Sequence, residues 1–175
     1  MCKETLINAT IQSLRLIRNP RFFSTERGFQ GEFFCALQNI LIEQGIIDES
    51  NILEMEYQKS EQRHKTRQRP DIILHVPVEV SGTGVTKNNY AVWALKMRAS
   101  TKNVLDDFGK LDEMFDILEY PLGFFINIDS PLHYFEKYTG SFADRLVTFA
   151  IQLTGSDITI KMAYWNNDAI VLVDI

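Results

Sequence analysis

The sequence predicts an α/β fold in which a central mixed sheet is flanked by helices. Segments with apolar residues at helical spacing alternate with short apolar runs that are typical of strands. Between residues 26 and 128, the predicted core, these segments follow in the order helix, strand, strand, strand, helix, strand. The sequence has no repeats, low-complexity tracts or linkers, so residues 1–175 are expected to form a single domain.

The first half of the chain predicts two helices and then three strands. Apolar residues at helical spacing predict a helix over residues 3–18, which Pro20 ends. A second helix is expected over residues 24–44, and the glycine that follows suits its C-terminal cap. Three apolar runs then predict strands, at residues 52–57, 71–76 and 90–96.

The second half predicts one more core helix and strand, followed by a C-terminal extension. Residues 101–118 carry apolar side chains at helical spacing, and the fully apolar run 122–128 is typical of a strand buried on both faces. Residues 141–153 are expected to form another helix. Residues 158–164 and 169–173 are expected to form a closing pair of strands. The first helix and these last elements lie outside the predicted core.

Charge, cysteine content and hydropathy indicate the compartment and exclude some partners. The net charge of −5 argues against nonspecific coating of nucleic acid by the whole surface, although it leaves room for a local basic patch. The longest apolar stretch, residues 120–128, is too short to span a bilayer, so no membrane partner is expected. The first residues do not resemble a secretion signal, and two cysteines cannot build a disulfide framework. We therefore expect a cytoplasmic protein.

Three positions on two predicted strands form the candidate site. Asp71 opens an apolar strand, where a carboxylate would be buried at a cost unless something binds it. On the next strand, alternation puts Ala94 and Lys96 on one side and Leu95 on the other. Two neighbouring strands would therefore bring Asp71, position 94 and Lys96 together at one edge of the sheet.

This arrangement resembles a known family. Pro70 and Asp71, followed after 22 residues by Ala94, Leu95 and Lys96, resemble the signature of the PD-(D/E)XK nucleases, and the element order matches their restriction-endonuclease-like αβββαβ core. The resemblance implies that the aspartate and the (D/E) acid hold a divalent metal, Mg²⁺ or Mn²⁺. It also implies that the lysine positions or activates the attacking water.

The resemblance extends to both flanking helices. A glutamate from the helix before the first strand often joins the family's site, and Glu32 is the best match for it, with Glu26 second. Asp71 and Glu32 are then the expected metal ligands. Asp107 or Lys110 would supply polar groups from the following helix.

The implied function is hydrolysis of DNA phosphodiester bonds, in host defence, restriction or a mobile element. Such chemistry needs a metal and a cation beside the transition state, and magnesium favours carboxylates with water. RNA is a possible alternative substrate, and many members of the family act as homodimers.

Ala94 departs from the family, because alanine cannot ligate a metal, and the Ala94 form is expected to be inactive. Three explanations remain open. The alanine is a substitution introduced into an active enzyme, the protein is a natural pseudonuclease, or the acid has moved to Glu79, Asp107 or Glu113. In the second case the domain is a noncatalytic module that binds DNA or another protein.

A basic stretch precedes the candidate site. Residues 59–69 contain five basic residues and one acid, which predicts either a loop that contacts phosphates or a solvated hairpin. The nucleic-acid-binding residues expected here and after the third strand are Arg63, Lys65, Arg67, Arg69, Arg98 and Lys102.

Overall fold

The structure is a computed structural model that describes residues 2–48, 52–56, 68–77, 82 and 86–175. Within them the α/β class and the predicted core order of helix, three strands, helix and strand are confirmed. The long helices are α1 (Lys3–Leu16), α2 (Glu26–Glu43) and α5 (Thr101–Ile117). Short 3-10 turns cover Pro20–Ser24, Phe135–Lys137 and Ala143–Arg145.

Local capping explains where the core helices begin and end. The Thr25 side chain accepts a hydrogen bond from the Gly28 amide at the start of α2. Gly45 has φ of +66° directly after this helix, as its predicted role in the cap requires. Ser100 and Asn103 form a reciprocal capping box at the start of α5.

The described strands form one mixed sheet of seven strands in chain order. Pairing is antiparallel from β1 to β3, parallel from β3 to β5 and antiparallel from β5 to β7. The parallel step from β3 to β4 is made through α5, a crossover that such pairing requires. The strands are β1 (Ile52–Met55), β2 (Ile72–His75), β3 (Asn89–Met97), β4 (Gly123–Ile128), β5 (Leu146–Thr154), β6 (Asp157–Asn166) and β7 (Ala169–Asp174).

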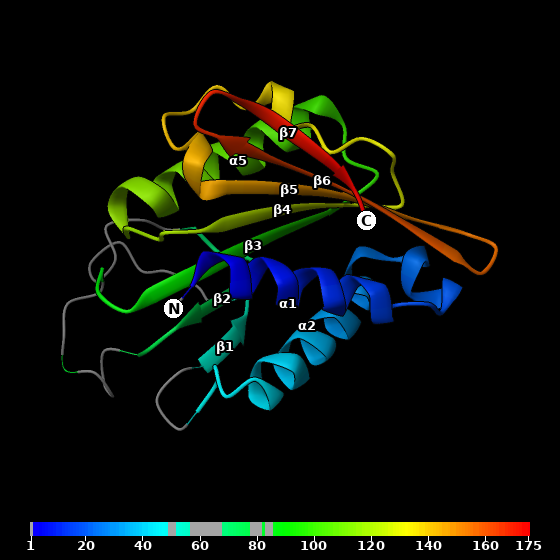
Figure 1. The fold of residues 1–175 in the computed structure, drawn as a ribbon, viewed down its shortest axis with the longest axis horizontal. Coiled ribbons are helices and arrows are strands. Elements are labelled where there is room, and N and C mark those ends of the chain that lie inside the picture. Colours follow the sequence, from blue (N-terminus) through cyan, green and yellow to red (C-terminus); the bar gives the residue numbers. More distant parts are fainter. Residues whose placement is uncertain (1, 49–51, 57–67, 78–81, 83–85) are drawn as a thin grey trace.

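The sheet separates two hydrophobic cores. Helices α1 and α2 pack on one face, where Trp93 and Leu95 of β3 join Phe29 and Phe33 of α2. Helix α5 packs on the other face against β3 and β4 (Figure 1). Alternate residues of β3 therefore belong to different cores, as the period of a strand requires.

The helix expected over residues 141–153 is wrong. The structure has a 3-10 turn at Ala143–Arg145 and then strand β5, which pairs with β4 and β6. Residues 146–151 are all buried, because both faces of this central strand are covered. Such a strand shows no apolar–polar alternation, and periodicity alone cannot then separate it from a buried helix.

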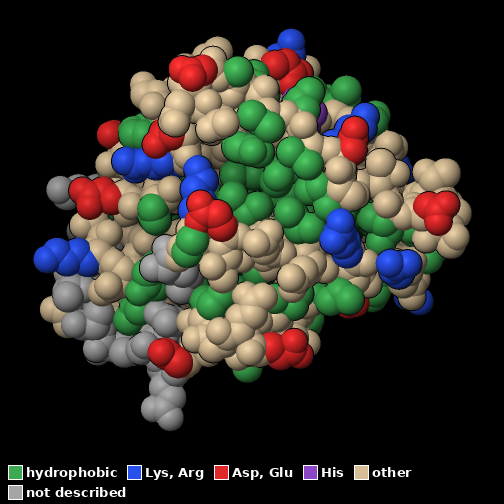
Figure 2. Space-filling model, viewed as in Figure 1, with side chains coloured by type: hydrophobic (Ala, Val, Ile, Leu, Met, Phe, Trp, Pro, Cys, Tyr) green, Lys and Arg blue, Asp and Glu red, His purple; other side chains and the backbone are tan. Residues whose placement is uncertain are grey.

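One face of the molecule carries a hydrophobic patch. Figure 2 shows apolar side chains gathered above α1, over the strands of the C-terminal half. The partly buried apolar residues that these strands contribute to the α1 side include Leu153, Ile158, Tyr164 and Val173. Among the described residues, no helix has the length and hydropathy that a membrane crossing needs.

Candidate functional site

A small pocket lies between β2, β3 and α5, on the α5 side of the sheet. Asp71, Ala94 and Lys96 all line it, so the structure brings together the three positions that the sequence predicted. Leu95 lies in the opposite core, which confirms the predicted alternation along β3. The pocket has a volume of about 50 Å³, enough for a cation and a few water molecules.

Asp71 is held rigidly at the start of β2. Its side-chain Oδ2 accepts a hydrogen bond from the Leu95 backbone N–H at 2.7 Å. Its backbone carbonyl accepts two more, from the Glu56 N–H at 2.8 Å and from the Gln30 side chain at 3.2 Å. The two backbone bonds fix the position of the residue, and the Leu95 bond fixes the direction of its carboxylate.

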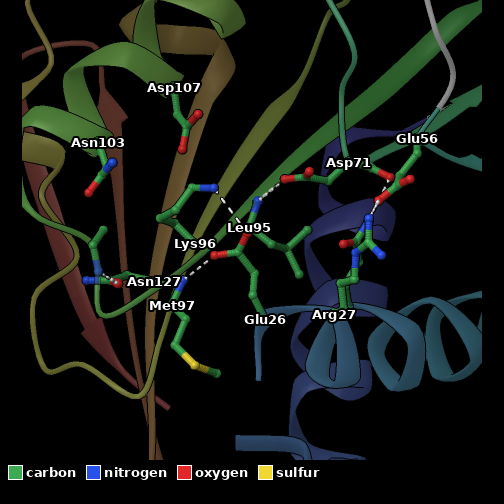
Figure 3. Close-up of polar contacts among 12 residues, drawn as sticks. Glu26, Arg27, Glu56, Asp71, Leu95, Lys96, Met97, Asn103, Asp107 and Asn127 are labelled. Carbon is green, nitrogen blue, oxygen red and sulfur yellow. Dashed lines mark hydrogen bonds and ion pairs between the residues drawn. The ribbon is translucent and has the colours of Figure 1, made fainter. Parts of the chain in front are cut away.

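Glu26 of α2 likewise accepts a hydrogen bond from a backbone amide of β3, two residues after Leu95. Its Oε2 accepts from the Met97 N–H at 2.9 Å, and its Oε1 accepts from Lys96 Nζ at 3.1 Å (Figure 3). The pairing of β2 with β3 ends where Ile72 meets Trp93. Asp71 and Glu26 thus satisfy β3 amides that have no strand partner on that edge, and unsatisfied amides would be costly.

The helix glutamate at Lys96 is Glu26, the second-ranked prediction, and not Glu32. Glu32 follows Glu26 by six residues, which in an α-helix corresponds to about 9 Å along the axis and about 120° around it. Glu32 therefore lies on a different side of α2, and no contact joins it to Asp71 or Lys96 in the described chain. Gln30 was missed, although its place one helical turn after Glu26 is the signal that could have identified it.

The environment keeps Lys96 protonated. Burial alone would lower the pKa of Lys96, but the hydrogen bond to Glu26 and the charges of Asp107, Glu26 and Asp71 raise it above its ordinary value. Lys96 is therefore a cation at neutral pH, so it is suited to orient water and stabilise negative charge.

The same surroundings also raise the pKa of Asp71, which for an acid favours the neutral form. Burial raises the pKa of its carboxyl to about 6. The Leu95 hydrogen bond and the Lys96 charge lower it, while the charges of Asp107 and Glu26 raise it further. Around neutral pH this carboxylate is mostly ionised, although it is held with little solvent around it.

Asp107 of α5 lines the same pocket. Its side chain is 7% exposed, and its Oδ1 accepts from Lys110 Nζ at 2.7 Å. Its Oδ2 is buried without a hydrogen-bond partner among the described residues. Of the other candidates for a displaced acid, Glu113 accepts a hydrogen bond from Gln68 at 3.0 Å, and Glu79 lies outside the described residues.

The structure describes three of the six residues predicted to contact nucleic acid. Arg63, Lys65 and Arg67 lie outside the described residues. Arg69 lines the pocket and forms an ion pair with Glu56. Arg98 donates to Asp129 with Nε at 2.7 Å, and Lys102 pairs with Asp106 at 3.0 Å.

These three ion pairs are largely exposed. The side chains of Arg69, Arg98 and Lys102 are 53%, 67% and 85% accessible. Pairs of this kind stabilise a protein by at most about 1 kcal/mol. A phosphate could therefore replace the carboxylate partner at little cost.

The carboxylates of the pocket suit a divalent cation that keeps most of its bound water molecules. Among the described residues, no group of three or more histidine, cysteine, aspartate or glutamate side chains is close enough to hold a metal ion. Magnesium, however, commonly binds through one or two carboxylates and several waters. Asp71 and Asp107 on the pocket wall, the latter with an unpartnered oxygen, meet that requirement.

Comparison of the chain with protein-family models, with curated proteins and with solved structures found no match.

Proposed function

We propose that this chain is a nuclease domain of the PD-(D/E)XK class, which hydrolyses phosphodiester bonds of DNA with Mg²⁺ or Mn²⁺. The observation that carries the proposal is the pocket under α5, where Asp71, Ala94 and Lys96 meet from two neighbouring strands. The order and pairing of the elements from α2 to β4, with a restriction-endonuclease-like succession of strands, support it further.

The residues of the pocket suit the charge changes of this reaction. In hydrolysis a water oxygen bonds to phosphorus, one bond from phosphorus to a sugar oxygen breaks, and that oxygen takes a proton. The transition state gains negative charge close to Lys96, which Glu26 holds in place. Mg²⁺, when bound at Asp71, would polarise the phosphate and lower the pKa of a water molecule.

Ala94 limits the activity of the chain as it stands, because it leaves the pocket one carboxylate short of the family's pattern. Its side chain lines the pocket beside Asp71 and Lys96, so a glutamate built there would reach the same space. Activity should therefore depend strongly on the residue at position 94.

The test is plasmid nicking with Mg²⁺ or Mn²⁺ by the Ala94→Glu variant. We expect it to cut at least about 100-fold faster than the parent chain, and Lys96→Ala in the same background to abolish the gain. Ala94→Gln, of equal size but uncharged, and Arg15→Ala, on the exposed surface of α1 across the sheet from the pocket, are the controls. A folded Ala94→Glu protein that cuts neither duplex DNA, single-stranded DNA nor RNA would refute the proposal.

The second candidate is a noncatalytic module that binds DNA or protein. One observation favours it: Asp71 and Glu26 both bond to β3 amides, a structural task that requires no metal. If the module is correct, Ala94→Glu will add no cleavage, and duplex DNA or a protein partner will bind equally well with and without Mg²⁺. Comparison of single-stranded RNA, single-stranded DNA and duplex DNA identifies the substrate in either case.

A further inference from the structure

The most unusual polar atom in the pocket is Oδ2 of Asp107. Its residue is almost completely buried, and this oxygen has no hydrogen-bond partner among the described residues. An unpartnered buried carboxylate oxygen costs folding free energy, because it has given up water without a replacement. Native proteins rarely keep such a group without a bound water, an ion or a functional use.

Asp107, which carries this oxygen, lines the same pocket as Ala94. Asp107 comes from α5, which covers the pocket, while Asp71 and Ala94 come from the sheet below. Figure 3 shows the Asp107 carboxylate directed from α5 toward the Lys96 amino group, with the Asp71 carboxylate on the other side of that group. The small Ala94 side chain leaves the space between the helix and the sheet unfilled.

We propose that Asp107 and Asp71 together form a divalent-cation site in this chain, with α5 supplying the carboxylate that β3 lacks at position 94. Asp71 bonds to Leu95 through Oδ2, and its Oδ1 makes no hydrogen bond to a described residue. Each aspartate therefore has one oxygen available. Two carboxylate oxygens completed by water form an ordinary magnesium or manganese site.

Lys110 competes with the cation. Its ammonium lies 2.7 Å from Oδ1 of Asp107, and its side chain is half exposed. It can therefore turn to solvent when a divalent ion binds, at the small cost of an exposed pair. Removal of Lys110 should tighten metal binding, whereas a purely structural Asp107–Lys110 pair predicts no change.

The site extends the proposed function and rests on it for its use in catalysis, but binding is measured without nucleic acid. The experiment is a titration of the 175-residue chain with Mn²⁺, followed by the EPR signal of the free ion, with Mg²⁺ as competitor. We expect one Mn²⁺ per chain. Asp107→Asn and Asp71→Asn should each weaken binding about tenfold or more.

Two further variants make the result specific. Asp106→Asn changes the neighbouring, exposed aspartate and should leave Mn²⁺ affinity unchanged. Lys110→Met should raise the affinity, and circular dichroism shows whether each variant is folded. Parent chain without bound Mn²⁺, or Asp107→Asn with parental affinity, would overturn the inference.

The inference and the proposed function can fail separately. A chain that binds Mn²⁺ through Asp107, but whose Ala94→Glu form cuts no nucleic acid, would support the cation site and contradict only the nuclease. A nuclease restored by Ala94→Glu whose parent chain binds no Mn²⁺ would contradict only the cation site.

Discussion

At the scale of single residues, Asp71 combines two tasks that favour different charge states. Its hydrogen bond from Leu95 favours the carboxylate, while burial, which is the larger effect, favours the neutral acid and raises the pKa to about 6. The ordinary value is 3.8, so the folded chain binds this proton more tightly than the unfolded chain does. The contribution of this tighter proton binding to the free energy of unfolding is fully present below about pH 4 and is lost as the pH rises through about 6.

The variant Asp71→Asn should remove this dependence. The amide oxygen can still accept the Leu95 hydrogen bond, while the buried charge is gone. We expect the variant to be more stable than the parent near neutral pH, by at most about 3 kcal/mol, and to lose less stability between about pH 4 and 6. Urea unfolding in EDTA at several pH values measures this, with Asp106→Asn as the control. Parallel pH profiles for parent and variant would contradict the expectation.

Glu26 and Glu32 offer a matched pair within one helix. Glu26→Ala removes the acceptor of two hydrogen bonds, from Met97 and Lys96, and we expect a loss of about 1–3 kcal/mol in the free energy of unfolding. Glu32→Ala, with no such contact, should change it by less than about 0.5 kcal/mol. Urea midpoints of both variants give the comparison. Equal losses would mean that the Glu26 contacts contribute nothing.

At the scale of the elements, prediction from sequence succeeded for segments with one buried face and for the unbroken apolar run that forms β4. The apolar spacing in residues 101–118, and for α2 the spacing together with the glycine that follows it, located those helices to within a residue or two. It failed for β5, which is covered on both faces and lacks alternation. It also ranked Glu32 above Glu26, because α2 has aromatic residues on more than one side and its orientation toward β3 depends on tertiary packing.

The residues of the candidate site likewise fall into those that the sequence predicts and those that depend on tertiary packing. Asp71, Ala94 and Lys96 were placed correctly because they follow from strand alternation and neighbouring strands. Asp107 was named as one of three candidates for a displaced acid, but its unpartnered oxygen is a property of the packed pocket. No pattern along the chain could have distinguished it from Glu113.

Strand β5 itself allows a test of its burial. The hydroxyl of Thr148 is buried, and its Oγ1 has no hydrogen-bond partner in the described part of the chain. Thr148→Val keeps the shape and the β-branch that a strand favours while removing the unsatisfied group. We expect an unchanged or higher stability, by up to about 1 kcal/mol, in thermal or urea unfolding. Thr159→Val, on the exposed part of β6, is the control, and a clear loss for Thr148→Val alone would contradict the expectation.

At the scale of the whole molecule, the sheet separates two surfaces with different chemistry. The pocket and α5 lie on one side, and α1, α2 and the hydrophobic patch lie on the other (Figures 1 and 2). The net charge of −5 means that any attraction to nucleic acid has to be local. Arg69 and Lys110 line the pocket, and Arg98 and Lys102 lie beyond the C-terminal end of β3, so these exposed basic residues can provide it.

The salt dependence of DNA binding measures that local contribution. If Arg98 and Lys102 each contact a phosphate, the double variant Arg98→Ala/Lys102→Ala should reduce the slope of log affinity against log salt by about 2, because each contact contributes about 0.9. The double variant Arg15→Ala/Arg18→Ala changes the net charge equally on exposed residues of the α1 side and should leave the slope unchanged. Fluorescence polarisation of a labelled duplex between about 50 and 200 mM salt gives both slopes. Equal slopes for the two double variants would mean that only overall charge matters, and DNA would then have to approach the pocket without these two residues.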